Sequence, residues 1–182
     1  MKKTTLLFVM LLLLSLPALA QPEQPQPGQN AKKPQWTAGI VSDTTNSTDT
    51  TVFVVTDFRT GRHETFDRLV LEFAESGTPN FCIAYVDIPV RRCGSAEPVS
   101  LQGEGWLMIR LYPAKMHKNG KSTIEKRDVQ VNFPVLLRAV TLCDFEAAVE
   151  WVAALVSPNR FRVMQLECPP RLVVDISHDH KN

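Results

Sequence analysis

The stretch Arg68-Leu69-Val70-Leu71-Glu72-Phe73 decides the fold, because a similar stretch, Arg171-Leu172-Val173-Val174-Asp175-Ile176, occurs about a hundred residues later. Each copy combines one arginine, four apolar residues and one acid. Side chains alternate between the two faces of a strand, so every second residue after the arginine shares an apolar face. The sequence therefore predicts two half-buried strands of one design, and this favours a β-rich binding module over an enzyme.

The two copies also predict how they pair. In a neighbouring antiparallel pair, one register sets Arg68 opposite Asp175. The same register sets Glu72 opposite Arg171. A parallel alignment would place arginine beside arginine, which cross-strand electrostatics disfavours. On an exposed face each ion pair is worth at most ~1 kcal/mol, so the pairs would specify the register more than they stabilise the sheet. The alternative is that the strands lie in different halves of a sandwich, where both arginines would be better candidates for ligand contacts.

The first twenty residues are typical of a secretory signal peptide. Lys2 and Lys3 precede an apolar run, and Ala18-Leu19-Ala20 supplies the small residues of a cleavage site. We expect a signal peptide at residues 1–20, a linker rich in proline and glutamine at 21–36, a β domain at 37–178 and a tail at 179–182. The protein would then be exported to a periplasmic or extracellular compartment without a membrane anchor.

The charge of the exported chain is nearly balanced. Of the 20 lysines and arginines, two lie in the signal peptide, which leaves 18 against 19 acidic residues. This balance argues against nucleic acid or a charged membrane surface as the partner.

Four cysteines remain after export: Cys82, Cys93, Cys143 and Cys168. An even number in an oxidising compartment favours two disulfides. No two of them form a C-x-x-C pair, so neither a zinc ribbon nor a thioredoxin-like centre is expected. Of the three possible pairings, we predict Cys82–Cys93, which flank a strand and its following turn. The second predicted bridge is Cys143–Cys168, which would flank a hairpin that turns near residues 157–159.

Short β-like runs alternate with turn signals from Val52 onward. This pattern predicts an all-β fold, a two-layer β-sandwich of short, mostly antiparallel strands. Residues 115–128 are polar and predict an exposed loop with a tight turn at Asn119-Gly120. Residues 144–157 combine apolar residues at helical spacing with several alanines, and Asp144 could cap a helix there. Propensity therefore predicts a short helical segment near residues 144–150.

Several short motifs, in order, resemble the AMIN-like domain family. They are Gly61-Arg62-His63-Glu64-Thr65-Phe66-Asp67-Arg68-Leu69-Val70, then Leu101-Gln102-Gly103-Glu104-Gly105-Trp106-Leu107, Tyr112-Pro113-Ala114, Phe161-Arg162-Val163 and Pro170-Arg171-Leu172-Val173-Val174-Asp175. The resemblance covers about residues 52–178. It implies a β-sandwich-like envelope domain, related to modules that localise cell-wall amidases by binding peptidoglycan. It also implies a strand at Glu150–Leu155, and we follow it there, because tertiary context overrides weak helix preference.

The sequence lacks a catalytic pattern. His63, Glu64 and Asp67 are interpreted as the polar start of a strand that faces water, because no nucleophile motif accompanies them. His178 and His180 lie on the terminal tail without an obvious third or fourth metal ligand. We therefore expect neither an enzyme nor a bound metal or other cofactor.

Three tryptophans could offer a flat face to a sugar ring. Trp151 lies in an apolar run and is expected in the core, Trp36 lies beside the linker, and Trp106 follows a glycine-rich turn. The candidate ligand contacts are Arg62, His63, Arg68, Trp106 and Arg171. The leading interpretation is an exported module that binds peptidoglycan or another envelope glycan. The alternative is an envelope protein–protein scaffold that uses exposed strand edges or the loop at residues 115–128.

The cleavage site makes a testable prediction about the exported chain. We expect its N-terminus to be Gln21, because Ala18 and Ala20 occupy the small-residue positions and no cysteine precedes Cys82. Intact-mass analysis of the exported protein measures this directly. A mass that includes residues 1–20, or an attached lipid, would contradict it.

Overall fold

The structure is a computed structural model that describes residues 34–45 and 51–179. The expected signal peptide, most of the linker and His180 lie outside these ranges. Thirteen strands occur within them. No helix in the described part of the chain is long and apolar enough to cross a membrane.

The thirteen strands form a six-stranded sheet, a five-stranded sheet and a two-stranded ribbon. The six-stranded sheet has the order β1 (Val41–Asp43), β4 (Asn80–Tyr85), β5 (Gly105–Tyr112), β11 (Ala148–Leu155), β10 (Leu136–Phe145), β9 (Asp128–Gln130). The five-stranded sheet has the order β12 (Phe161–Glu167), β13 (Pro170–Ser177), β3 (Phe66–Phe73), β2 (Phe53–Arg62), β6 (Ala114–Lys115). The ribbon is β7 (His117–Lys118) with β8 (Lys121–Ser122).

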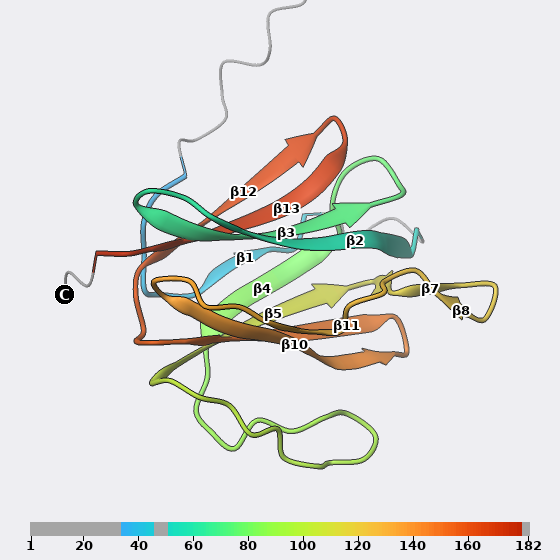
Figure 1. The fold of residues 1–182 in the computed structure, drawn as a ribbon. Coiled ribbons are helices and arrows are strands. Elements are labelled where there is room, and N and C mark those ends of the chain that lie inside the picture. The colour runs from blue at the N-terminus through green and yellow to red at the C-terminus, as the bar shows by residue number, and fades with distance from the viewer. Residues whose placement is uncertain (1–33, 46–50, 180–182) are drawn as a thin grey trace, which may run out of the picture. The chain divides into compact units, whose positions relative to one another are not determined.

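The two large sheets lie face to face as two layers (Figure 1). Every strand pair is antiparallel except β2 with β6. The apolar faces predicted for the two arginine-led strands point into the core, where Leu69, Leu71, Leu172 and Ile176 are almost fully buried. The prediction of an all-β, two-layer β-sandwich is therefore confirmed.

The predicted register of the repeated stretch is also confirmed. Strand β13 pairs antiparallel with β3, with Asp175 opposite Arg68 and Arg171 opposite Glu72. The alternative of different halves of a sandwich is wrong. Only the first pair forms an ion pair, with 2.6 Å between Arg68 Nε and Asp175 Oδ1. Glu72 instead binds Arg59 at 2.8 Å, and Arg171 donates to a carbonyl of the β12–β13 turn.

The helix predicted near residues 144–150 is wrong, and the strand that the family resemblance implied is right. Strand β10 continues to Phe145, and Glu146 and Ala147 form a turn with φ of 48° and 58° before β11 begins. Two residues with positive φ are typical of a tight hairpin turn. Strand β11 contacts apolar side chains on both faces, so it lacks the alternation of a half-buried strand. Its continuous apolar run therefore also fitted a helical period.

A long segment without large strands, which we call the flap (residues 86–104), connects β4 to β5. In Figure 1 the flap lies on the outer side of the six-stranded sheet, away from the other layer. There it covers a second, smaller apolar cluster: Val90, Met108, Val140, Leu142 and Val152. A disulfide between Cys93 of the flap and Cys143 of β10 holds it in place, with a Cα–Cα distance of 5.2 Å.

Both predicted disulfide pairings are wrong. Cys93 does not return to Cys82 of β4, because the flap crosses the sheet to β10, where the Cys93 N–H donates to the Leu142 carbonyl. Cys143 does not reach Cys168, because β11 and β12 belong to different sheets and do not form the hairpin that the prediction assumed. Cys82 and Cys168 have free thiols.

The inward face of β3 also carries a polar tie between the sheets. Asp67 is fully buried, and its Oδ2 atom accepts hydrogen bonds of 2.8 Å from the backbone N–H groups of Val135 and Leu136, where β10 begins. Its Oδ1 atom lies 2.9 Å from His178 Nε2, just after β13. One carboxylate thus connects the five-stranded sheet to the six-stranded sheet. The expectation that Asp67 faces water is wrong.

The cysteine arrangement predicts the outcome of peptide mapping. Without reduction, we expect one cross-linked peptide pair, containing Cys93 and Cys143, while Cys82 and Cys168 react with an alkylating reagent. Replacing both Cys93 and Cys143 by Ala is expected to destabilise the protein by about 2–4 kcal/mol, because the bridge closes a loop of 50 residues. Urea denaturation measures the change, and a Cys82–Cys93 peptide would contradict the prediction.

Removing the buried Asp67 carboxylate is expected to lower the free energy of unfolding more than removing an exposed ion pair. Asp67→Ala would leave the N–H groups of Val135 and Leu136 unpaired in the interior, which costs roughly 2–4 kcal/mol of unfolding free energy. Asp57→Ala, which removes the exposed contact with Arg59, serves as the control and should cost less than about 1 kcal/mol. Equal effects in urea denaturation would show that Asp67 does not tie the sheets.

Candidate functional site

Cationic and aromatic side chains gather on the outer face of the five-stranded sheet, at one end of β12, β13 and β3. The strand registers place Arg162, Asp175 and Arg68 in one row across these three strands. Their side chains point away from the core, because the flanking residues of each strand point into it. This row is the base of the candidate site.

Asp175 lies between two arginines. Arg68 binds it through two hydrogen bonds, from Nε at 2.6 Å and from Nη2 at 3.0 Å. Arg162 approaches the Oδ2 atom with Nε at 2.9 Å and Nη2 at 2.8 Å. The Asp175 side chain has no exposed surface, whereas those of Arg68 and Arg162 are 29% and 25% exposed. The hydrogen bond to Asp175 raises the pKa of Arg68 above its ordinary value, so this guanidinium stays charged.

Aromatic rings hold the two guanidinium groups from the sides. The Arg162 guanidinium lies 4.5 Å from the centre of the Trp36 ring and 5.2 Å from that of Phe66. Arg68 lies 5.0 Å from the Phe66 ring, and the His63 ring stacks on Phe66 at 4.4 Å. We call Trp36, His63, Phe66, Arg68 and Arg162, with Asp175 beneath them, the arginine–aromatic platform.

The chain before the first strand brings Trp36 to the platform. Thr37 and Phe161 exchange two backbone hydrogen bonds of 2.8 and 2.7 Å, which fix this segment along the free edge of β12. Phe66 is positioned by the hairpin that joins β2 to β3, where the His63 N–H donates to the Phe66 carbonyl at 2.9 Å. Three separate parts of the chain therefore meet at this surface.

The five predicted ligand contacts are not brought together as a set. His63 and Arg68 belong to the platform, and Arg62 is exposed at the adjacent end of β2. Arg171 lies on the same face but four residues from Asp175 along β13, about 13 Å away. Trp106 lies on the other sheet, where it packs against the second apolar cluster with its indole Nε1 atom buried.

Sequence reasoning missed Arg162 and Phe66 as site residues, and it considered Trp36 without choosing it. A hairpin between β12 and β13 sets Arg162 directly opposite Asp175, so this pairing was a usable signal. The signal was lost because Phe161 and its neighbours were assigned to a hairpin with the preceding strand. For Trp36 the sequence carries no comparable signal, because its neighbour Thr37 contacts a strand more than a hundred residues away.

The residues considered for catalysis or metal binding have other roles. His63 and Glu64 are exposed, but the Asp67 carboxylate is enclosed and already accepts three hydrogen bonds. His178 is bound between Asp67 and the Glu64 carbonyl, so it is not part of a frayed tail. Within residues 34–45 and 51–179, no group of three or more His, Cys, Asp or Glu side chains could hold a metal ion.

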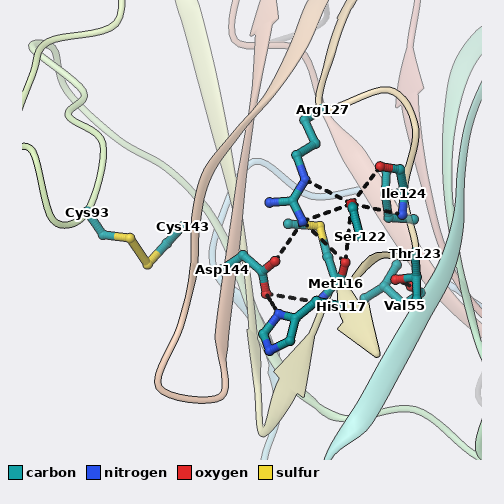
Figure 2. A network of polar contacts seen from close by, with 10 residues as sticks. All are labelled: Val55, Cys93, Met116, His117, Ser122, Thr123, Ile124, Arg127, Cys143 and Asp144. Atoms are coloured by element: carbon teal, nitrogen blue, oxygen red, sulfur yellow. Dashed lines mark hydrogen bonds and ion pairs between the residues drawn. A yellow bond between two sulfur atoms is a disulfide. The ribbon is translucent and has the colours of Figure 1, made fainter. Parts of the chain in front are cut away.

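A second polar network lies at the base of the β7–β8 ribbon, next to the disulfide (Figure 2). The Asp144 carboxylate accepts hydrogen bonds from the Met116 backbone N–H at 2.9 Å and from Arg127 Nη2 at 2.7 Å. It also lies 3.1 Å from His117 Nδ1. Burial raises the pKa of Asp144, but these hydrogen bonds together outweigh it and hold the pKa below its ordinary value. The network anchors residues 115–128 to β10.

Residues 115–128 are thus more ordered than the expected exposed loop. They contain β7 and β8, which are joined by the predicted tight turn at Asn119-Gly120, with φ of 51° and 73°. Thr123 Oγ1 of this region donates to the Val55 carbonyl of β2 at 2.6 Å, and a groove of about 510 Å³ beside this contact is lined by residues 56–59 and 123–126. Strand β6 pairs only with Phe53 and Val54, so in the described residues the edge of β2 beyond them has no neighbouring strand.

The fold defines a class: a two-layer β-sandwich module, here with arginine and aromatic side chains gathered on one outer face. Comparison with protein families then identifies the chain as a member of the AMIN-like domain family, whose model matches residues 53–178. Membership of this family indicates a cell-envelope module. No curated protein and no solved structure matched the chain. Trp36 lies outside the matched residues, whereas the rest of the platform lies within them.

The network in Figure 2 predicts a loss of stability in acid. A carboxylate with a lowered pKa in the folded state stabilises the protein above its ordinary pKa, and this contribution is lost as the pH falls through the lowered value. We expect Asp144→Asn to cost roughly 1–3 kcal/mol at pH 7, and progressively less as the pH falls below 3.8, the ordinary pKa of an aspartate. Urea denaturation across this range measures the difference. The control Glu104→Gln, at an exposed position, should leave the free energy of unfolding unchanged at neutral and at acidic pH. An effect of Asp144→Asn that does not depend on pH would contradict the prediction.

Proposed function

We propose that this protein is an exported, non-catalytic module that binds peptidoglycan or another envelope glycan through the arginine–aromatic platform. The observation that carries the proposal is the stack of Trp36, Arg162 and Phe66 on an outer sheet face. Flat aromatic surfaces contact the apolar faces of sugar rings, and guanidinium groups donate hydrogen bonds to their oxygens. Membership of a family of cell-envelope domains supports the same interpretation.

Other observations support the proposal that the protein is exported. The proposed signal peptide at residues 1–20 would direct the chain out of the cytoplasm, and the linker at residues 21–36 would separate the β domain from the cleavage site. The Cys93–Cys143 bridge fits an oxidising compartment, where disulfides persist. We place the mature protein in the periplasm or outside the cell, without a bound cofactor.

Co-sedimentation of the mature chain with insoluble peptidoglycan tests the proposal. We expect the protein to be retained, and Trp36→Ala to weaken retention about tenfold, because it removes an aromatic surface and its contact with Arg162. The control is Tyr112→Ala, which removes an exposed aromatic ring from the other sheet. A clean supernatant for the unchanged protein would overturn the proposal, as would equal losses for the two variants.

A second candidate function is that of an envelope protein–protein scaffold without glycan binding. The unpaired edge of β2 and the groove beside it favour this alternative, because an extended peptide could add a strand there. Replacing Thr60 in this edge by Pro would block such pairing. If the scaffold function holds, Thr60→Pro abolishes capture of a partner while Trp36→Ala leaves it unchanged.

A further inference from the structure

We propose that the platform binds an oxyanion, a carboxylate or a phosphate, that is attached to the envelope polymer. Arg68 and Arg162 would donate the hydrogen bonds, beside the aromatic rings that contact the sugar. This inference rests on the proposed glycan-binding function and specifies the chemical group that the site recognises. It follows from the charge, the free donors and the rigidity of the row across β12, β13 and β3.

The charges of the row do not cancel. Two guanidinium groups meet one carboxylate, so one positive charge remains. On β12, β13 and β3 the next row of this face is Met164, Val173 and Val70, which carry no charge, and the residue opposite Val70 in β2 is a third cation, Arg59. The nearest acid beyond it on β3 is Glu72, about 13 Å from Arg68 along the strand and already paired with Arg59. The excess charge is therefore available to a ligand.

The guanidinium groups also keep free donors. Each has five N–H groups, and both arginines use their Nε and Nη2 atoms for Asp175. The Nη1 atoms of Arg68 and Arg162 make no hydrogen bond to any described residue. Both side chains are about a quarter exposed, so a ligand can reach them. Planar guanidinium donors match the geometry of carboxylate and phosphate oxygens.

The arginines are held in place before a ligand arrives. Asp175 fixes both from below, while Trp36 and Phe66 stack against Arg162 from the sides. Binding therefore costs less side-chain entropy than it would with mobile surface arginines. A purely structural ion pair would need only one guanidinium, because Arg68 alone already makes two hydrogen bonds to Asp175. The second arginine is thus better explained by recognition of a ligand.

The experiment uses the mature chain and three preparations of insoluble peptidoglycan: untreated, with carboxylates converted to methylamides, and with phosphodiester-linked polymers removed by hydrofluoric acid. We expect one treatment to weaken retention about tenfold, the scale of a lost charge-assisted hydrogen bond. Loss on amidation identifies a carboxylate, and loss on acid treatment identifies a phosphate. Retention that depends on Trp36 but is unchanged by both treatments would overturn the oxyanion while leaving glycan binding intact.

Variants separate recognition from folding. Arg162→Lys keeps the positive charge but loses the planar donor group, and we expect it to weaken retention on untreated peptidoglycan about tenfold. On the preparation that lacks the recognised anion, Arg162→Lys should cause no further loss. Arg59→Lys, on the same sheet face, is the matched control and should bind normally. If Arg162→Lys binds as well as the control, with thermal unfolding showing both folded, the proposal is overturned.

A second measurement does not depend on peptidoglycan. In NMR titrations of the unchanged protein, D-glucuronate or inorganic phosphate should shift the Nε–Hε signals of Arg68 and Arg162, while D-glucose should not. Unshifted signals with both anions would overturn the oxyanion site. Shifted signals in a protein that peptidoglycan does not retain would support the oxyanion site and overturn the proposed glycan function alone.

Discussion

The antiparallel register between β3 and β13 is the constraint on which the rest of the structure depends. It places the opening and closing segments of the domain side by side at the centre of the five-stranded sheet. If β13 slipped by one residue against β3, Leu172 would turn outward and Asp175 inward, away from Arg68. The core and the ion pair between Arg68 and Asp175 therefore require the same register. The apolar face supplies most of the stability, and the charged face adds specificity.

Two buried carboxylates, one on each face of this sheet, have different roles. Asp67 points inward and joins β3 to the start of β10, whereas Asp175 points outward and orients the arginines of the platform. A buried carboxylate is costly unless hydrogen bonds or opposite charges surround it. Each of these two carboxylates therefore holds its hydrogen-bond partners in defined positions. Because Arg68 follows Asp67 directly in β3, the tie between the sheets and the platform share one rigid strand.

The two outer faces of the sandwich differ in what covers them. The flap and the Cys93–Cys143 bridge cover part of the six-stranded sheet and bury Met108, Val140 and Val152. In the part of the chain that the structure describes, no comparable segment covers the platform on the five-stranded sheet, where Arg68 and Arg162 keep exposed surface. The platform therefore stays exposed on the face of the sandwich that lies opposite the flap. Trp36 extends that surface beyond the part of the chain that matches the family.

The sequence by itself determined the all-β class, the inward faces of β3 and β13 and the register between them, because a period of two and paired charges are local patterns. It also identified His63 and Arg68 as candidate contacts. Only the tertiary structure decided the disulfide and the meeting of Trp36, Phe66 and Arg162. These depend on which sheet a strand joins and on where a long connection crosses, and neither is encoded in local periodicity. Periodicity alone did not identify β11, which the family resemblance implied, because burial on both faces removes the alternation that identifies a strand.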